Sequence, residues 1–228
     1  MSQIPLLLAA EREHSFDNFY VGENAAVVTA LQYPLKHDFI YLHGEHHVGK
    51  SHLVQALSNI YQAQGELVQH VHSNMLSEQS LLDVLPQAVL YVIDGIEDVA
   101  GDAAAENGLF KLYNHLHPQQ AALLLTSLLP PQSAQWQLPD LISRLNSGQI
   151  LQLKALRGSQ AFELFQSMCE HMGLELSERA LNYLQVHSQS AFPQLYQLLI
   201  ALNQRTLSER KRISIVLLKQ LLTELQHG

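Results

Sequence analysis

Hydrophobic positions in the first two thirds of the chain fall into short, nearly continuous runs separated by amphipathic stretches. A run such as residues 88–93 is typical of a strand buried on both faces of a parallel sheet. Between the runs, the spacing of Leu53, Leu57 and Ile60 places apolar side chains on one helical face. Alternating strands and helices predict a doubly wound α/β sheet. We expect its strands at residues 39–42, 67–71, 88–93, 121–125 and 150–153, and a helix through Tyr113 that ends near Pro118.

The pattern changes after residue 156, where the strand-like runs stop. Ala161, Leu164 and Phe165 begin a spacing typical of an amphipathic helix, and Ser177 is a suitable cap for a second helix. Two more helices are expected around residues 195–202 and 216–221. The sequence therefore predicts an N-terminal peptide at 1–13, an α/β domain at 14–155 and a small all-helical lid domain at 156–228.

Composition and charge narrow the class of protein. The chain has 228 residues, of which 47% are hydrophobic and 15% charged, and no apolar run approaches the ~20 residues that cross a bilayer. A single cysteine excludes an internal disulfide and favours a reducing cytoplasm. The net charge of −8 argues against stand-alone DNA binding, since phosphate neutralisation needs a basic face. The only dense basic cluster, residues 205–212, is interpreted as an exposed turn between helices, although it could touch DNA.

A phosphate-binding pattern follows the first predicted strand. Residues 44–51 fit G-x-x-x-x-G-K-[ST] at every fixed position and open a helix. Glycines let the backbone N–H groups turn toward phosphates, Lys50 adds a positive charge, and the Ser51 hydroxyl can bind Mg²⁺. A glycine-rich turn that binds nothing is the alternative. The expected nucleotide contacts here are Gly44, His47, Val48, Gly49, Lys50, Ser51 and Leu53.

An acidic residue ends the most apolar strand. Asp94 is placed to hold Mg²⁺ through water, together with Ser51, and Mg²⁺ is the metal we expect. A turn-forming role is the alternative for Asp94. P-loop hydrolases of this kind usually carry a second acid directly afterwards, but this chain has Gly95. Glu97 and Asp98 are close in sequence and are expected on a different part of the loop.

Two further positions invite interpretation. Thr126 and Ser127 end the fourth predicted strand, where a polar side chain could sense a γ-phosphate. Arg144 closes a short amphipathic segment, from which an arginine could reach phosphates of a neighbouring subunit. From the pattern alone, a surface arginine in a salt bridge is the stronger interpretation of Arg144.

Together these motifs resemble the AAA+ domain of the bacterial replication initiator DnaA and its shorter relatives, from about residue 16 to the end. Residues 16–24 resemble the family's first segment, whose Val-Gly-x-Asn region lies against adenine, which implies nucleotide contacts by Val21 and Asn24. The phosphate loop, Asp94, Thr126 and the segment 138–145 follow in the family's order. The resemblance implies that Arg144 is an arginine finger acting in trans.

The N-terminus resembles a clamp-binding peptide of the type Gln-Leu-x-Leu-Phe/Leu. Gln3 would make polar contacts while Ile4, Leu6 and Leu7 fill an apolar pocket on the DNA polymerase III sliding clamp (beta subunit). An apolar tail that packs on its own domain is the alternative.

Two departures from the family pattern concern hydrolysis. Gly95 stands where DnaA has a second acid, and Pro193 stands where the family has an arginine at the start of the third lid helix. Both weaken the case for ATP hydrolysis by this chain more than they weaken nucleotide binding. The sequence also has no counterpart of the DnaA helix-turn-helix domain, so we expect DNA to be contacted only indirectly or weakly.

The resemblance implies a regulator that binds ADP or ATP with Mg²⁺, docks on the DNA-loaded clamp and stimulates ATP hydrolysis by DnaA. Re-initiation of replication would thereby be inhibited, with little ATPase activity of the regulator itself. A self-contained AAA+ ATPase such as a helicase loader, and an adaptor without nucleotide binding, are the alternatives. The sequence leaves self-association open.

Overall fold

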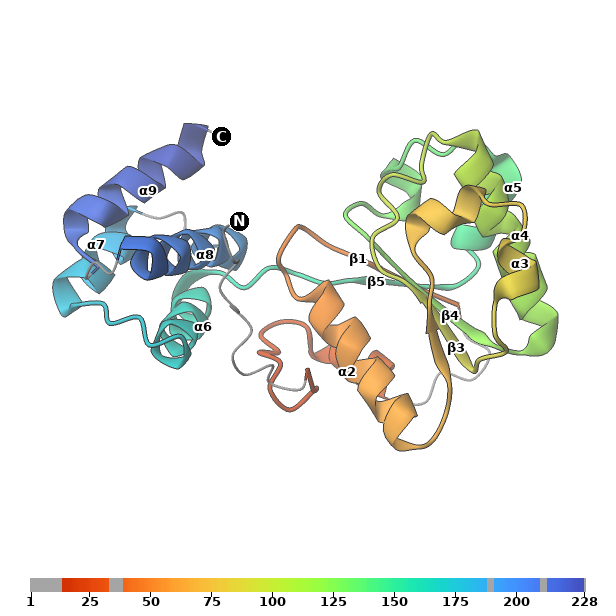
Figure 1. Ribbon diagram of the computed structural model, residues 1–228, viewed down its shortest axis with the longest axis horizontal. Coiled ribbons are helices and arrows are strands. Elements are labelled where there is room, and N and C mark those ends of the chain that lie inside the picture. Colours follow the sequence, from red (N-terminus) through yellow and green to blue (C-terminus); the bar gives the residue numbers. More distant parts are fainter. Residues whose placement is uncertain (1–13, 33–38, 188–190, 210–212, 228) are drawn as a thin grey trace. The chain divides into compact units, whose positions relative to one another are not determined.

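The computed structural model describes residues 14–32, 39–187, 191–209 and 213–227 (Figure 1). The chain forms two compact units: Met1–Gly44 with Gly49–Leu153, and Glu45–Val48 with Lys154–Gly228. The predicted clamp peptide, with Gln3, Ile4, Leu6 and Leu7, lies outside the described residues. No helix among those residues has both the length and the apolar character needed to cross a membrane.

The first unit contains the predicted α/β sheet. Within its described residues, five parallel strands pair in the order β2-β3-β4-β1-β5. The strands are β1 (Phe39–His43), β2 (Val68–His70), β3 (Leu90–Ile93), β4 (Ala122–Ser127) and β5 (Gln149–Gln152). The predicted fold class is confirmed, although β2 and β3 are shorter than expected. Leu67, for example, is 51% exposed and lies outside β2.

Helices cover both faces of this sheet, with α2 on the opposite side from α4 and α5 (Figure 1). They are α1 (Ala25–Gln32), α2 (Lys50–Ala63), α3 (Leu81–Val84), α4 (Ala103–Gln119) and α5 (Pro139–Leu145), with 3₁₀ turns η1 (Ser73–Ser77) and η2 (Pro131–Ser133). The expected end of α4 near Pro118 is confirmed, since the helix ends at Gln119, one residue after the proline in its last turn.

The core between the sheet and α4 contains two fully buried tyrosines. Tyr41 and Tyr91 pack among leucines of α4 and α5. Each hydroxyl is satisfied, as burial requires. The Tyr41 hydroxyl donates to the carbonyl oxygen of Leu129 at 3.0 Å, and that of Tyr91 donates to the carbonyl oxygen of Pro86 at 2.7 Å.

The second unit is helical, as predicted. Its helices are α6 (Gly158–His171), α7 (Glu178–His187), α8 (Phe192–Glu209) and α9 (Ile215–His227). The Ala180 N–H donates to Ser177 Oγ at 3.3 Å, so the predicted cap is present. Buried leucines at the helix contacts, such as Leu184, Leu199 and Leu202, form the core of this unit.

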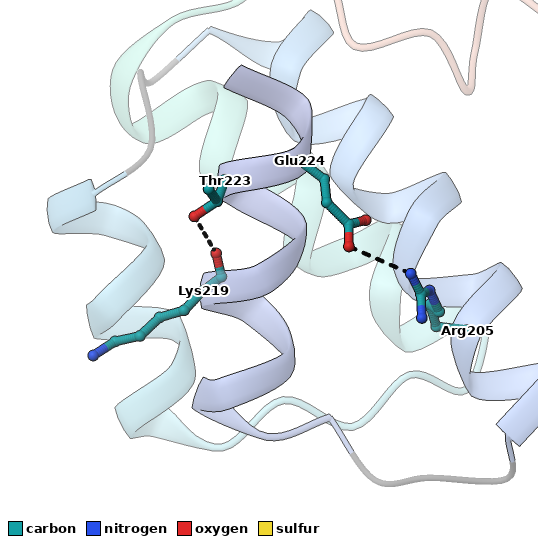
Figure 2. Close-up of polar contacts among 4 residues, drawn as sticks. All are labelled: Arg205, Lys219, Thr223 and Glu224. Carbon is teal, nitrogen blue, oxygen red and sulfur yellow. Dashed lines mark hydrogen bonds and ion pairs between the residues drawn. The ribbon is translucent and has the colours of Figure 1, made fainter. Parts of the chain in front are cut away.

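Figure 2 shows the polar contacts of α8 and α9. An ion pair of 3.4 Å joins Arg205 to Glu224, and the Thr223 hydroxyl donates to the carbonyl oxygen of Lys219 at 2.9 Å. Both partners of the ion pair are about half exposed, so it contributes less than about 1 kcal/mol. The prediction of a turn from residue 205 is wrong for Arg205, which is exposed as expected but lies within α8, since this helix extends to Glu209. Residues 210–212 lie outside the described part.

Candidate nucleotide site

The loop between β1 and α2, called the phosphate loop below, has the backbone of a phosphate-binding turn. Its first residue, Gly44, donates its N–H to the carbonyl oxygen of Ser127 at 3.1 Å, which anchors the loop to β4. His47 and Gly49 have positive φ angles of 58° and 102°. Gly49 is the N-cap of α2 and provides no side-chain cap, so the first-turn N–H groups of α2 keep their capacity to bind an anion.

Gly49 also needs to be glycine for steric reasons. A Cβ built on it would lie 2.7 Å from Cε2 of Phe19, closer than a carbon–carbon contact allows. The Phe19 ring in turn packs on His52, with ring centroids 5.4 Å apart, and His52 Nε2 lies 2.9 Å from the carbonyl oxygen of Ser15. The segment before α1 is thereby held against the phosphate loop.

The predicted adenine contacts follow Phe19 in the chain and form the turn that begins α1. The Asn24 N–H donates to the carbonyl oxygen of Val21 at 2.8 Å, and the carbonyl oxygen of Asn24 accepts from the Val28 N–H at 2.9 Å. Asn24 is buried and Val21 is half-buried. Sequence reasoning missed Phe19 as the residue that joins this segment to the loop. Its aromatic side chain within the first family-like motif was the available signal.

Lys50, the first residue of α2, turns its ammonium group toward the loop. Its Nζ donates to the carbonyl oxygen of Gly44 at 2.7 Å. Burial lowers the pKa of Lys50, and the carboxylates of Glu97 and Asp94 oppose this shift. Both acids are therefore close enough to act electrostatically on the lysine that would face a phosphate.

Asp94 is oriented by Thr126. The Thr126 hydroxyl donates to Asp94 Oδ1 at 2.5 Å and accepts from the Gly95 N–H at 2.8 Å. Thr126 is fully buried. In this arrangement Thr126 contributes to the site by directing the Asp94 carboxylate. Ser51 is exposed at the start of α2, as a hydroxyl that binds Mg²⁺ needs to be.

The side chain of Glu97, which was expected nearby but on a different part of the loop, reaches back to position 95. Gly95 has a φ of 84°, a left-handed conformation that turns the chain sharply after β3. A Cβ built on Gly95 would lie 3.1 Å from Oε2 of Glu97. The Glu97 carboxylate therefore lies where it would contact the side chain of any residue other than glycine at position 95. An acid two residues after a glycine at a strand end was the signal in the sequence.

The remaining predicted contacts in or near the loop differ in exposure. Val48 and Leu53 are buried, and Leu53, completely inaccessible, belongs to the packing of α2. His47 is exposed. Ser127 is buried at the end of β4, where its Oγ accepts from the Leu129 N–H at 3.4 Å. In the second unit, Pro193 occupies the first turn of α8.

Arg144 lies at the end of the sheet where the strands begin, opposite to the end where the phosphate loop follows β1. It is in the last turn of α5, shortly before β5, and is exposed. A Cβ on Gly148 would clash with Phe39, the first residue of β1. The segment that joins α5 to β5 therefore lies where β1 begins. The phosphate loop follows the last residue of β1, which has 5 residues and spans about 13 Å. The structure thus places Arg144 and the phosphate loop of the same chain at opposite ends of β1.

The fold and site define the class of protein. The parallel sheet has the strand order given above, with a glycine-lysine loop after β1 and an acid after β3, and the chain also has a helical lid unit. These features make this an AAA+ protein. Residues 10–152 match the family model described as the bacterial DnaA ATPase domain, so the chain belongs to the bacterial DnaA ATPase family. Residues 159–222 match the model described as the Hda lid domain. The combination points to a DnaA-related replication regulator.

Solved structures agree with this fold. Domain III of Thermotoga maritima DnaA has a TM-score of 0.77 at 21% identity, over 94% of this chain and 97% of that chain. DnaA bound to AMPPCP and single-stranded DNA has a TM-score of 0.69 at 19% identity, over 87% of this chain and 66% of that one. AMPPCP-bound DnaA from Aquifex aeolicus has a TM-score of 0.66 at 18% identity, over 87% of this chain and 69% of that chain. The chain thus spans about two thirds of these two longer initiator chains.

Proposed function

We propose that this protein is a nucleotide-binding regulator that stimulates ATP hydrolysis by DnaA and so inhibits re-initiation of replication. The position of Arg144 carries the proposal. Arg144 is exposed and lies over Tyr113, whose ring meets Phe39 at the start of β1, whereas the phosphate loop follows the end of that strand, about 13 Å further along, so we infer that this arginine does not serve the nucleotide of its own chain. It is free to serve the nucleotide of a partner.

In the proposed mechanism, Arg144 acts in the active site of DnaA. In hydrolysis the oxygen of a water molecule bonds to the γ-phosphorus while the bond from that phosphorus to the oxygen bridging to the β-phosphate breaks, which gives ADP, phosphate and a proton released to solvent. Negative charge grows on the phosphate oxygens in the transition state. The guanidinium of Arg144 is planar and permanently charged, so it can donate two parallel hydrogen bonds to such oxygens. An arginine supplied in trans in this way accelerates phosphoryl transfer by up to several orders of magnitude.

The phosphate loop would hold ADP or ATP as a structural ligand. The N–H groups at the start of α2 and the ammonium of Lys50 fit the phosphates, and Ser51 with Asp94 fits Mg²⁺. Bound Mg²⁺ would neutralise phosphate charge there. The AMPPCP in the similar DnaA structures supports an adenine nucleotide.

Docking on the DNA polymerase III sliding clamp completes the proposal. Gln3, Ile4, Leu6 and Leu7 would bind the clamp, which would concentrate the regulator near DnaA on newly replicated DNA. This places the protein in the cytoplasm and leaves its own contact with DNA indirect or weak.

The test is DnaA ATP hydrolysis in the presence of DNA-loaded clamp. We expect Arg144→Ala to reduce the stimulation at least tenfold, because the charge that stabilises the transition state is lost. Arg179→Ala, which removes an exposed arginine of α7, is the matched control and should stimulate like the wild type. Equal stimulation by Arg144→Ala and wild type would refute this mechanism.

A self-contained ATPase is the second candidate function, and the position of Glu97 favours it. The carboxylate beside Gly95 could orient an attacking water as the second acid does in other P-loop hydrolases. The purified protein would then hydrolyse ATP at a rate near ~1 per second, within the ordinary range for enzymes. Glu97→Gln should abolish that turnover, while Asp98→Asn, its exposed neighbour, should not. Turnover that survives Glu97→Gln would remove this candidate.

An adaptor without nucleotide binding is distinguished by thermal unfolding. Saturating ADP stabilises a folded protein that binds it, because the ligand does not bind the unfolded chain. An unchanged melting temperature with ADP and Mg²⁺ would favour the adaptor.

A further inference from the structure

Arg144 has an aromatic neighbour on α4. Its guanidinium carbon lies 5.6 Å from the ring centroid of Tyr113, within the range of a cation–π interaction. No signal in the sequence joined these two residues, since they lie on different helices. The contact is between two residues of the same compact unit.

The Tyr113 ring is itself held in place. It meets the ring of Phe39 edge-on, with centroids 5.4 Å apart and an interplanar angle of 89°. The Tyr113 hydroxyl lies 3.2 Å from Ser147 Oγ, and the Ser147 hydroxyl donates to the carbonyl oxygen of Arg144 at 2.7 Å. Tyr113 therefore contacts the arginine through its ring and, through Ser147, the backbone of the same residue.

An arginine at a helix end has several side-chain rotamers, and restricting them beforehand lowers the entropy lost when the guanidinium meets the phosphate in the transition state. A fixed aromatic face reduces that freedom without neutralising the charge. An acidic partner would compete with phosphate for the guanidinium, whereas a ring leaves its N–H groups able to donate.

We propose that Tyr113 is a positioning residue for Arg144: its ring holds the guanidinium in the orientation from which it contacts phosphate bound to a partner protein. The proposal rests on the proposed function of Arg144. It concerns a different residue and a different property, the orientation of the finger before the partner binds.

The test compares Tyr113→Phe with Tyr113→Leu in the DnaA hydrolysis assay with loaded clamp. Tyr113→Phe keeps the ring and should retain nearly full stimulation. Tyr113→Leu removes the ring and should lower the maximal rate two- to fivefold, equivalent to about 0.4–1 kcal/mol. The concentration of regulator at half-maximal stimulation should stay unchanged, because the surface that binds the partner is retained.

A double-mutant cycle separates positioning from a general structural effect. In the Arg144→Ala background, Tyr113→Leu should cause no further loss, because the residue it positions is gone. A similar loss in both backgrounds, or wild-type stimulation by Tyr113→Leu, or higher stimulation by it, would overturn the proposal.

Proton NMR of the wild-type protein tests the same contact without a variant that has to fold. The δ-methylene protons of Arg144 should resonate upfield of ordinary arginine values because the adjoining guanidinium group lies over the ring, and unshifted resonances would overturn the proposal. If the wild type does not stimulate DnaA, the proposed function fails on its own. If it does stimulate DnaA and Tyr113→Leu stimulates equally, only the positioning role fails.

Discussion

Glu106 offers the sharpest test of how the scaffold carries Arg144. It lies in the first turn of α4 and is completely buried. Its carboxylate accepts from the Gly101 N–H at 2.8 Å, from the Gln137 N–H at 2.9 and 3.0 Å, and from the Leu138 N–H at 2.7 Å. Leu138 is the N-cap of α5, so this one carboxylate joins α4 to the start of the helix whose last turn contains Arg144.

Replacing Glu106 by alanine leaves three backbone donors without their acceptor. A net hydrogen bond to a charged group contributes about 1.5–3 kcal/mol, and the cost of desolvating the carboxylate is recovered when it is removed. We therefore expect Glu106→Ala to lower the free energy of unfolding by about 3–5 kcal/mol, because each buried N–H left without an acceptor costs about 1–3 kcal/mol and the recovered desolvation offsets part of that sum. Glu106→Gln retains one acceptor oxygen but turns an amide group toward a donor, and should cost about half as much.

Urea denaturation followed by tryptophan fluorescence measures this directly. The chain has a single tryptophan, Trp136, which is buried beside Gln137 in the α/β unit, so the signal follows the unfolding of this region. Glu78→Ala, which removes an exposed acid in the same unit, is the control and should change stability by less than about 0.5 kcal/mol. A loss below about 1 kcal/mol for Glu106→Ala would show that these contacts do not hold the segment.

Three further outcomes follow from the structure. Gly108→Ala should destabilise the protein by more than about 3 kcal/mol in urea unfolding, because the Cβ of alanine would collide with the carbonyl group of Leu76 and this outweighs its better helix propensity. A variant as stable as the wild type would contradict this backbone contact. Burial lowers the pKa values of His43 and His52, so the unfolded chain binds more protons than the folded one near the ordinary histidine pKa. The free energy of unfolding should therefore fall as the pH drops below about 6.5. A free energy of unfolding that does not change between about pH 7.5 and 5.5 would refute this. Burial raises the pKa of the Cys169 thiol to about 12, so it should react with a thiol reagent at pH 8 only after unfolding, and rapid labelling of the native protein would oppose this.

Local patterns in the sequence were enough to predict the elements that depend on neighbours along the chain. Continuous apolar runs predicted the strands, because a parallel sheet covered by helices buries both faces of each strand. The glycine and lysine positions of the phosphate loop were also predictable, since the loop connects one strand directly to the next helix. Their roles in binding nucleotide remain predictions. Helix α1 was missed because it is short, with only 8 residues.

Contacts between distant segments could be decided only by the fold. Nothing in the spacing of Phe19 and Gly49, or of Tyr113 and Arg144, indicates that their atoms meet. Glu106 reads as an exposed acid in a first helical turn, yet it is completely buried by the segment before α5. The separation of Arg144 from the phosphate loop likewise depends on the pairing of β5 with β1 in parallel, which places the segment before β5 where β1 begins.

In this chain, local spacing and hydrogen-bonding capacity are enough to predict the class of fold, the phosphate loop and the residue types available for chemistry. Which of those residues lie together depends on how the elements pack. The left-handed turn at Gly95 brings Glu97 beside the site, and the packing of α4 on α5 gives Arg144 its aromatic support. Such contacts are set by the packing of whole elements against one another, which no local pattern encodes.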